Sequence, residues 1–182
     1  MVIISNYELQ HIDDSIYSVK SNEDMPSCPC CGSLLRYRDR KLRVWMKEGG
    51  EKQYIQIRRL RCSNPDCHRY HQELPNCIVP YKHYESEVIS GVLDGVVLEE
   101  DLDSEDYPCV TTMFRWLAWF QTNIPEIENY IKKYGSDLID LKIIEYSPEF
   151  LNLQKLQNVS CCWLETVVQI IYNNDGFLIP VY

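Results

Sequence analysis

Two close pairs of cysteines are the residues whose types and spacing point most directly to chemistry. Cys28 and Cys31 lie in segment 28–32, which reads C-P-C-C-G, and Cys62 and Cys67 follow after a 30-residue interval. A pair separated by two to four residues lets a tight turn aim two thiolates at one ion, while turn amides donate to the sulfurs. Two such turns complete a tetrahedral S4 site. We therefore expect one structural Zn²⁺ on Cys28, Cys31, Cys62 and Cys67.

Other arrangements of these residues stay open. The cysteines could be free thiols, or three of them could bind an ion whose fourth ligand is His68 or His71. Cys30 could also replace a neighbour within the first pair. In a reducing compartment, nine cysteines, an odd number, are better explained by metal binding and buried thiols than by disulfides.

Two catalytic motifs overlap this region, and neither has the context that its chemistry needs. Residues 28–31 match the C-P-x-C pattern of glutaredoxin-like enzymes, but the polar residues 21–24 precede them instead of a strand. Residues 71–73 match the H-x-E of zinc deaminases, but no P-C-x-x-C follows. An ion with four cysteine ligands has no open position for water. We therefore expect no catalytic residues and no enzymatic activity.

The interval between the cysteine pairs predicts a small antiparallel sheet. Residues 34–40, 42–47 and 54–61 are typical of short strands, and residues 48–51 are typical of a hairpin turn. Strands pinned by a metal form a zinc ribbon, which we place at residues 28–80. Its core is too small to be stable alone, so the metal should supply much of the free energy of folding.

The net charge of -9 conceals a basic segment. Residues 28–82 contain 12 basic and 5 acidic residues, whereas residues 1–27 contain 1 and 5, and residues 83–182 contain 5 and 17. The middle segment could meet a polyanion, which the rest of the chain would repel. The alternative is a solvated basic face without a partner.

Arginines alternate along the first predicted strand, so the side chains of Arg36, Arg38 and Arg40 should leave the same face of the sheet. Guanidinium groups match phosphate geometry, and a neighbouring aromatic ring can stack on a base. If the aromatic residues instead fill the core, the arginines only keep the ribbon soluble. The interleaved aromatic residues are Tyr37, Trp45 and Tyr54. The expected nucleic-acid contacts of the ribbon are Arg36, Arg38, Arg40, Lys41, Arg43, Arg58, Arg59 and Arg61.

The periodicity changes from two to 3.6 after Pro80, which predicts helices. A first helix should run from about His83 to near Gly95, and another should begin at Thr111 or Thr112. Residues 99–106, with six acidic side chains, should form a short helix or an acidic loop between them. Helix, linker and helix are the outline of a helix-turn-helix.

The second of these helices has two faces. Its apolar inward stripe comprises Val110, Met113, Leu117 and Phe120. The other face could enter a DNA groove through Thr112, Arg115 and Trp119. Only Arg115 is basic there, and acidic residues precede the helix, so phosphate binding by the ribbon should matter more than base reading.

The last third of the chain should be helical. We expect helices from 125 to about 134, from 148, and over 159–172, while 137–146 is ambiguous. The apolar residues of 159–172 cover much of a helix circumference, which favours the central core helix over a homodimer face. Segment 177–182 should dock on the body or capture a partner. The remaining cysteines, Cys77, Cys109, Cys161 and Cys162, should be small buried thiols.

Together these features predict an α+β chain: a small β zinc ribbon followed by an all-α region. Its parts are an acidic N-terminal arm at 1–27, the zinc ribbon at 28–80, a helix-turn-helix-like region at 81–124 and a C-terminal helical region at 125–182. No apolar run approaches the roughly 18 residues of a membrane helix, so we expect a cytoplasmic protein.

Several short motifs resemble an uncharacterised family of bacterial proteins that is similar to the zinc-ribbon and helix-turn-helix front end of transposases. The motifs are C-P-C-C-G at 28–32, R-R-L-R-C at 58–62, C-H-R-Y-H at 67–71, L-P at 74–75, V-P-Y-K at 79–82 and T-M-F-R-W at 112–116. The resemblance spans about residues 26–121. It implies zinc on the four cysteines and DNA contact through the ribbon and the helix that contains Arg115 and Trp116. Phe114 stands where the pattern has a basic residue, and residues 125–182 are too few for a ribonuclease-H-like catalytic domain.

Two functions follow as hypotheses. The first is a non-catalytic zinc protein that binds DNA, with a separate recombinase or another protein as a possible partner. The second is a protein-interaction adaptor with a purely structural zinc ribbon.

Overall fold

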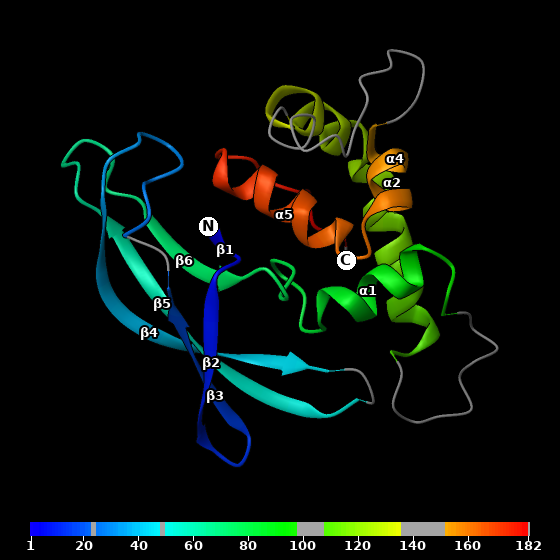
Figure 1. Cartoon of the computed structure of the whole chain (residues 1–182), viewed down its shortest axis with the longest axis horizontal. Helices are drawn as coiled ribbons and strands as arrows, with labels where there is room; N and C mark the ends of the chain where they lie inside the picture. Colours follow the sequence, from blue (N-terminus) through cyan, green and yellow to red (C-terminus); the bar gives the residue numbers. More distant parts are fainter. Residues whose placement is uncertain (23–24, 48–49, 98–107, 136–151, 182) are drawn as a thin grey trace.

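A long antiparallel hairpin of β4 (Leu35–Met46) and β5 (Lys52–Cys62) contains the two longest strands of the sheet in the computed structural model (Figure 1). The structure describes residues 1–22, 25–47, 50–97, 108–135 and 152–181. The hairpin occupies nearly the residues that alternation predicts, with one continuous strand where two short ones were expected. The predicted turn at 48–51 lies partly outside the described residues.

The other edge of β5 pairs with two different strands. Its first half is parallel to β3 (Ile16–Ser21), and its second half is antiparallel to β6 (Tyr70–Pro75). β2 (Tyr7–Asp13) pairs antiparallel with the outer edge of β3, and β1 (Val2–Ile4) pairs in parallel with β6. The result is a curled mixed sheet of six strands in the order β1-β6-β5-β3-β2. β4 pairs with β5 along the edge opposite to β6 and β3.

One extra residue in β4 breaks the alternation of the arginines. Arg38 is that residue, because the register with β5 shifts there. Arg36 therefore lies opposite Arg61, and Arg40 lies opposite Arg58. Arg58 and Arg61 are an odd number of residues apart and face opposite sides of the sheet. The prediction that Arg36, Arg38 and Arg40 share one face is wrong.

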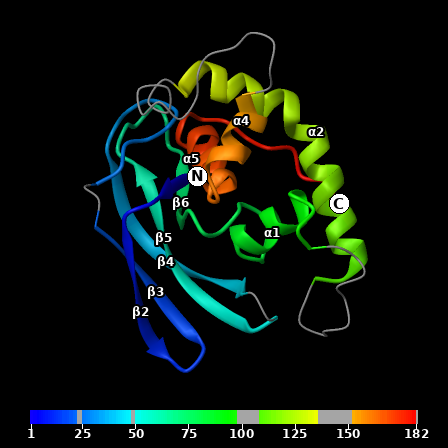
Figure 2. The same cartoon turned by 45° about the vertical axis from the view of Figure 1, so that its right-hand side comes forward.

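Four described helices lie to one side of the sheet (Figure 2). They are α1 (Ser86–Leu93), α2 (Val110–Tyr134), α4 (Asn152–Val159) and α5 (Trp163–Asn173). α2 continues through Pro125, although proline removes one backbone hydrogen bond. Its buried stripe continues past this point with Ile127 and Ile131. The Asn123 side chain donates to the carbonyls of Trp119 and Ile179 and accepts from the Ile179 amide. One long helix thus replaces the two that were expected.

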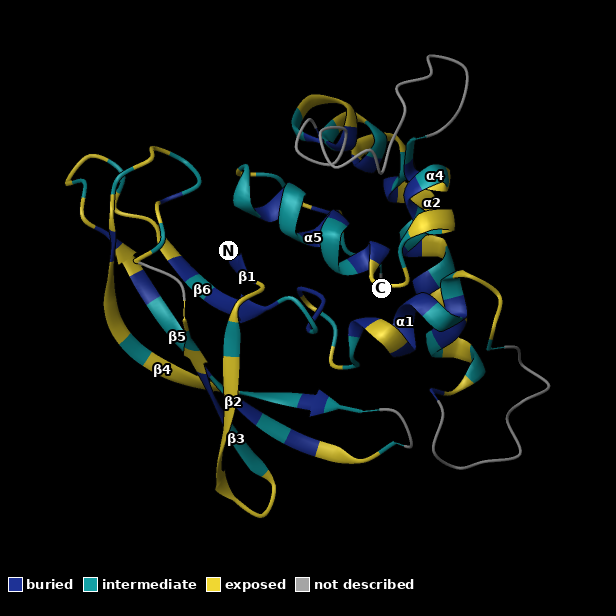
Figure 3. Ribbon diagram, viewed as in Figure 1, coloured by how far each residue is buried: buried dark blue, intermediate teal, exposed yellow. Residues whose placement is uncertain are grey.

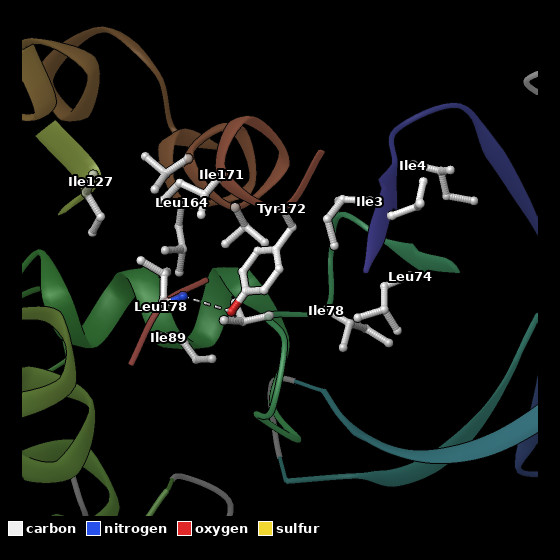
Figure 4. Close-up of a cluster of buried hydrophobic side chains, with 14 of the residues drawn as sticks. Ile3, Ile4, Leu74, Ile78, Ile89, Ile127, Leu164, Ile171, Tyr172 and Leu178 are labelled. Carbon is white, nitrogen blue, oxygen red and sulfur yellow. Dashed lines mark hydrogen bonds between the residues drawn. The ribbon is translucent and has the colours of Figure 1, made fainter. Parts of the chain in front are cut away.

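α5 is the central helix of the core. Trp163, Leu164, Val167, Val168 and Ile171 are each at most 1% exposed. They meet β1, β6 and the C-terminal segment in a cluster that includes Ile3, Leu74 and Leu178 (Figure 4). The apolar circumference of this helix is therefore buried within the chain, as the core interpretation predicts, and segment 177–181 docks through Leu178.

The predicted fold class, a zinc ribbon followed by an all-α region, is wrong. The residues expected as an acidic arm form three strands of the sheet, and β6 lies beyond the last strand that was predicted. The reason is non-local, because β1 and β3 pair in parallel with strands far along the chain. A separate helix-turn-helix is not formed either, since α1 and α2 pack with α5 into one layer. Segments 99–106 and 137–146 and the helix start at 148 lie outside the described residues.

Among the helices described, none combines the length and apolar character needed to cross a bilayer.

Asn173 fastens α5 to β1 and provides a test of this arrangement. Its side chain accepts from the Ile3 amide at 2.8 Å and donates to the Ile3 carbonyl at 2.9 Å. Asn173→Ala leaves both groups unpaired, and each costs about 1–3 kcal/mol. We expect the free energy of unfolding in urea to fall by about 2 kcal/mol or more. Gln169→Ala on the same helix removes only a 3.4 Å surface hydrogen bond and should change it by less than about 0.5 kcal/mol. Equal stability of the two variants would contradict this role of Asn173.

Candidate metal centre and the basic surface beside it

The four predicted metal ligands converge. The sulfurs of Cys28, Cys31, Cys62 and Cys67 all lie within 4.8 Å of one another. Cys28 and Cys67 are 3.8 Å apart, and Cys31 and Cys62 are 3.5 Å apart. A tetrahedral ion with zinc–sulfur bonds of about 2.3 Å requires sulfur separations of about 3.8 Å. These four cysteines could hold one metal ion, in the geometry that a structural zinc would use.

Two matching turns bring the sulfurs together. The first precedes β4 and the second joins β5 to β6, so both lie at the same end of the hairpin, where Leu35 pairs with Cys62. Each turn continues with a residue of left-handed backbone conformation: Gly32 (φ 71°) after Cys31 and His68 (φ 51°) after Cys67. This conformation reverses the chain at once behind each pair of sulfurs.

Backbone amides point at three of the sulfurs, each from two residues further along the chain. Ser33 donates to Cys31 through its side chain and its amide, and these bonds lower the pKa of Cys31 to about 6. The Asn64 amide donates to Cys62, although burial raises the pKa of that thiol to about 12. The Arg69 amide donates to Cys67. Amide donors aimed at sulfur stabilise the thiolate that a metal needs.

The two histidines considered as ligands behave differently. His68 is exposed and lies outside the sulfur group. His71 is 4% exposed, and its Nε2 lies 3.3 Å from the Cys28 sulfur. Burial lowers the pKa of His71 to about 4, so the ring is neutral near pH 7 and can donate from Nε2 to that sulfur. The Cys30 sulfur is not a member of the four-sulfur group and contacts Asp175 and Arg69.

Four of the predicted nucleic-acid contacts are engaged within the protein. Arg58 holds the buried Glu73 carboxylate by two bonds, at 2.5 and 2.6 Å, and Arg59 pairs in the same way with Asp39. Arg40 donates to Gln56 on the paired strand β5 and to Ser18 on β3. Arg43 donates to the Lys82 carbonyl. These guanidinium groups organise the sheet and its edges.

The other predicted arginines gather beside the metal centre. Arg36, Arg38 and Arg61 line a hollow of about 430 Å³, together with Tyr37 and the second cysteine turn from Cys62 to His68. Figure 3 shows that the adjoining part of β4 is largely exposed. Lys41 is exposed further along the same strand.

Tyr37 lines this hollow, and Tyr70 lies beneath Arg38 beside it. Tyr37 and Tyr70 are 55% and 53% exposed, and the Arg38 guanidinium lies over the Tyr70 ring at 4.5 Å. On the sequence alone, His68 is a candidate only for metal binding, and neither His68 nor Tyr70 is assigned to this surface, although both closely follow Cys67. Trp45 is buried and fills the core, so it cannot stack on a base.

The helical face that was expected to enter a groove is not free to do so. Trp119 is 2% exposed and lies beneath the Lys82 ammonium. Thr112 contacts the Cys109 sulfur, and of the three predicted residues only Arg115 is exposed. The prediction that Trp119 contacts DNA is therefore wrong. Cys109, Cys161 and Cys162 are exposed and Cys77 is half-buried, contrary to the expectation of buried thiols.

A comparison with known protein families matches the segment that contains the metal centre and the basic surface beside it. Residues 28–116 match the family model described as a domain of unknown function, DUF6431. The match begins at the first metal-centre cysteine and ends at Trp116 in α2. It agrees with the resemblance to an uncharacterised family over about 26–121, but it names no transposase or DNA-binding protein. No curated protein and no solved structure matches the chain.

Zinc should protect the four clustered cysteines from alkylation. With one equivalent of zinc at pH 7, labelling by iodoacetamide should be strongly slowed at Cys28, Cys31, Cys62 and Cys67, because thiolates bound to an ion are poor nucleophiles. The exposed Cys161 should react equally with and without zinc. As a chelator withdraws the ion, Cys31 should react first, since its pKa lies near 6. Mass spectrometry of the labelled peptides measures this, and unprotected cysteines would refute the four-sulfur site.

Alanine variants of Arg58 and Arg61 should distinguish an arginine that stabilises the fold from one that contributes only surface charge. Arg58→Ala leaves the Glu73 carboxylate, 1% exposed, without its cation, which should cost about 3–5 kcal/mol of unfolding free energy. Arg61→Ala removes an exposed side chain and should cost less than about 0.5 kcal/mol. Denaturant unfolding measures both. Comparable losses would show that Arg61 has a structural role that its exposure does not indicate.

Proposed function

We propose that this protein is a non-catalytic, metal-stabilised DNA-binding protein, and that it binds phosphates at the hollow formed by Arg36, Arg38 and Arg61. The observation that supports this most is the pairing of Arg36 directly opposite Arg61. Like charges facing each other across two strands are destabilising unless an anion lies between them. Among the described residues, no carboxylate pairs with either side chain.

The chemistry of the hollow suits a phosphodiester. Arginine presents a planar fork of donors that matches two phosphate oxygens. Tyr37 and Tyr70 add exposed aromatic surface on which a sugar or base can rest. Ser63 and Asn64 of the second cysteine turn add polar groups to the lining of the hollow.

The metal centre would position this surface. The turn from Cys62 to Cys67 forms one wall of the hollow, and Cys62 directly follows Arg61. An ion bound by the two turns would therefore fix the end of the hairpin where the arginines lie. The acidic remainder of the chain would be repelled by DNA, which restricts binding to this side.

The test is fluorescence anisotropy of the zinc-loaded protein on random duplex DNA over a salt series. Log affinity should fall linearly with log salt. Replacing Arg36, Arg38 and Arg61 with alanine should weaken binding on all sequences. It should also reduce the slope by about 2–3, because each phosphate that the protein no longer neutralises lowers the slope by roughly one.

Arg115→Ala is the matched control, since it removes an exposed arginine from α2. It should leave the affinity and the slope unchanged. Equal losses in both variants would move the DNA-binding surface to the helix. Absence of binding even at low salt would refute the proposal and leave a protein-binding role for the metal-stabilised fold.

A further inference from the structure

A second group of metal-ligand side chains adjoins the four-sulfur centre. The Cys28 sulfur, the Cys30 sulfur and a ring nitrogen of His71 lie within 4.8 Å of one another. Cys28 belongs to both groups: its sulfur is 3.8 Å from Cys67 on one side and 3.3 Å from His71 Nε2 on the other. It is 2% exposed and lies between the two sets.

Cys30 is not needed by the first group. Its thiol donates to Asp175 Oδ1 at 2.9 Å, and the Arg69 guanidinium lies 3.0 Å from the same sulfur. Asp175 is distant from Cys30 in the sequence and lies two residues after the end of α5, with a left-handed backbone conformation of φ 57°. The cluster thus joins the first cysteine turn to the C-terminal segment.

We propose that this cluster is a second metal position, in which a thiophilic divalent ion binds Cys28, Cys30, His71 and a ligand from solvent, with the Cys28 thiolate bridging both ions. Cysteine and histidine select zinc-like ions, and a thiolate can be shared because its sulfur keeps more than one lone pair. Asp175 accepts the Cys30 thiol hydrogen and pairs with Arg69, so when Cys30 loses its proton the bound ion and Arg69 together offset the charges of the thiolate and the adjacent carboxylate.

The protons and charges balance. On binding, the Cys30 thiol releases its proton to solvent, and the His71 ring carries its proton on Nδ1 so that Nε2 presents a lone pair. Two divalent ions, five thiolates and one carboxylate have a formal charge of -2. The Arg69 guanidinium, 3.2 Å from Asp175, reduces it to -1. This arginine therefore offsets the excess negative charge of the pair of ions.

Cadmium substitution tests this proposal without any variant. Titration of the metal-free protein with ¹¹³Cd²⁺ should give two resonances at saturation, coupled to each other through the bridging Cys28 sulfur, and native mass spectrometry with zinc should show two ions per chain. One resonance and one ion at saturation would overturn the proposal and leave His71 as a hydrogen-bond donor to Cys28.

Two variants then assign the second ion. Cys30→Ser and His71→Gln should each lower the stoichiometry from two to one while the first ion and the far-ultraviolet circular dichroism are kept. Cys109→Ser, an exposed cysteine outside both groups, should retain two ions. Retention of two ions by both site variants would place the second ion elsewhere and overturn the assignment. These readouts do not involve DNA, so their outcome is independent of the proposed phosphate-binding function.

Discussion

The convergence of four cysteine sulfurs within 4.8 Å is the constraint on which the rest of this structure depends. Four thiolates at such distances repel one another unless a cation lies among them. If the cysteines were instead neutral thiols, the backbone amides that point at three of the sulfurs would have only weak acceptors. The two turns that hold these sulfurs bracket the β4–β5 hairpin and lead into β6. β6 pairs with β1, and β1 is fastened to α5 by Asn173. A continuous series of contacts therefore runs from the sulfurs to the core helix.

The same constraint gives the basic surface its position. Part of the positive charge in the middle of the chain is neutralised within the sheet, where Arg58 and Arg59 hold carboxylates. Arg36, Arg38 and Arg61 stay exposed around the second cysteine turn, where the β-bulge at Arg38 places a third guanidinium beside the Arg36–Arg61 pair. A metal at the sulfurs would stiffen the wall of this hollow. Arg36 and Arg61 have no carboxylate partner among the described residues, whereas Arg38 lies 3.5 Å from Asp39.

Local signals in the sequence predicted what local geometry determines. The spacing of the cysteines predicted the sulfur cluster because a short turn fixes where its two sulfurs point. Alternation predicted most of β4 and β5, and the apolar circumference of 159–172 predicted the core position of α5. The pairings of β1 and β3 were missed because their partners lie some 40 to 70 residues away and no turn connects them. The bulge at Arg38 was missed because one extra residue leaves no mark on composition. Trp119 was misplaced because its polar ring nitrogen suggested a surface position, whereas its ring packs inward.

The most direct test of whether one ion joins the two cysteine turns is X-ray absorption at the zinc edge. The protein is loaded with a single equivalent of zinc. We expect a first shell of four sulfurs at about 2.3 Å, from the two turns acting together. A shell dominated by nitrogen and oxygen, or one with only two sulfurs, would contradict this expectation, because the turns would then not be joined by one ion.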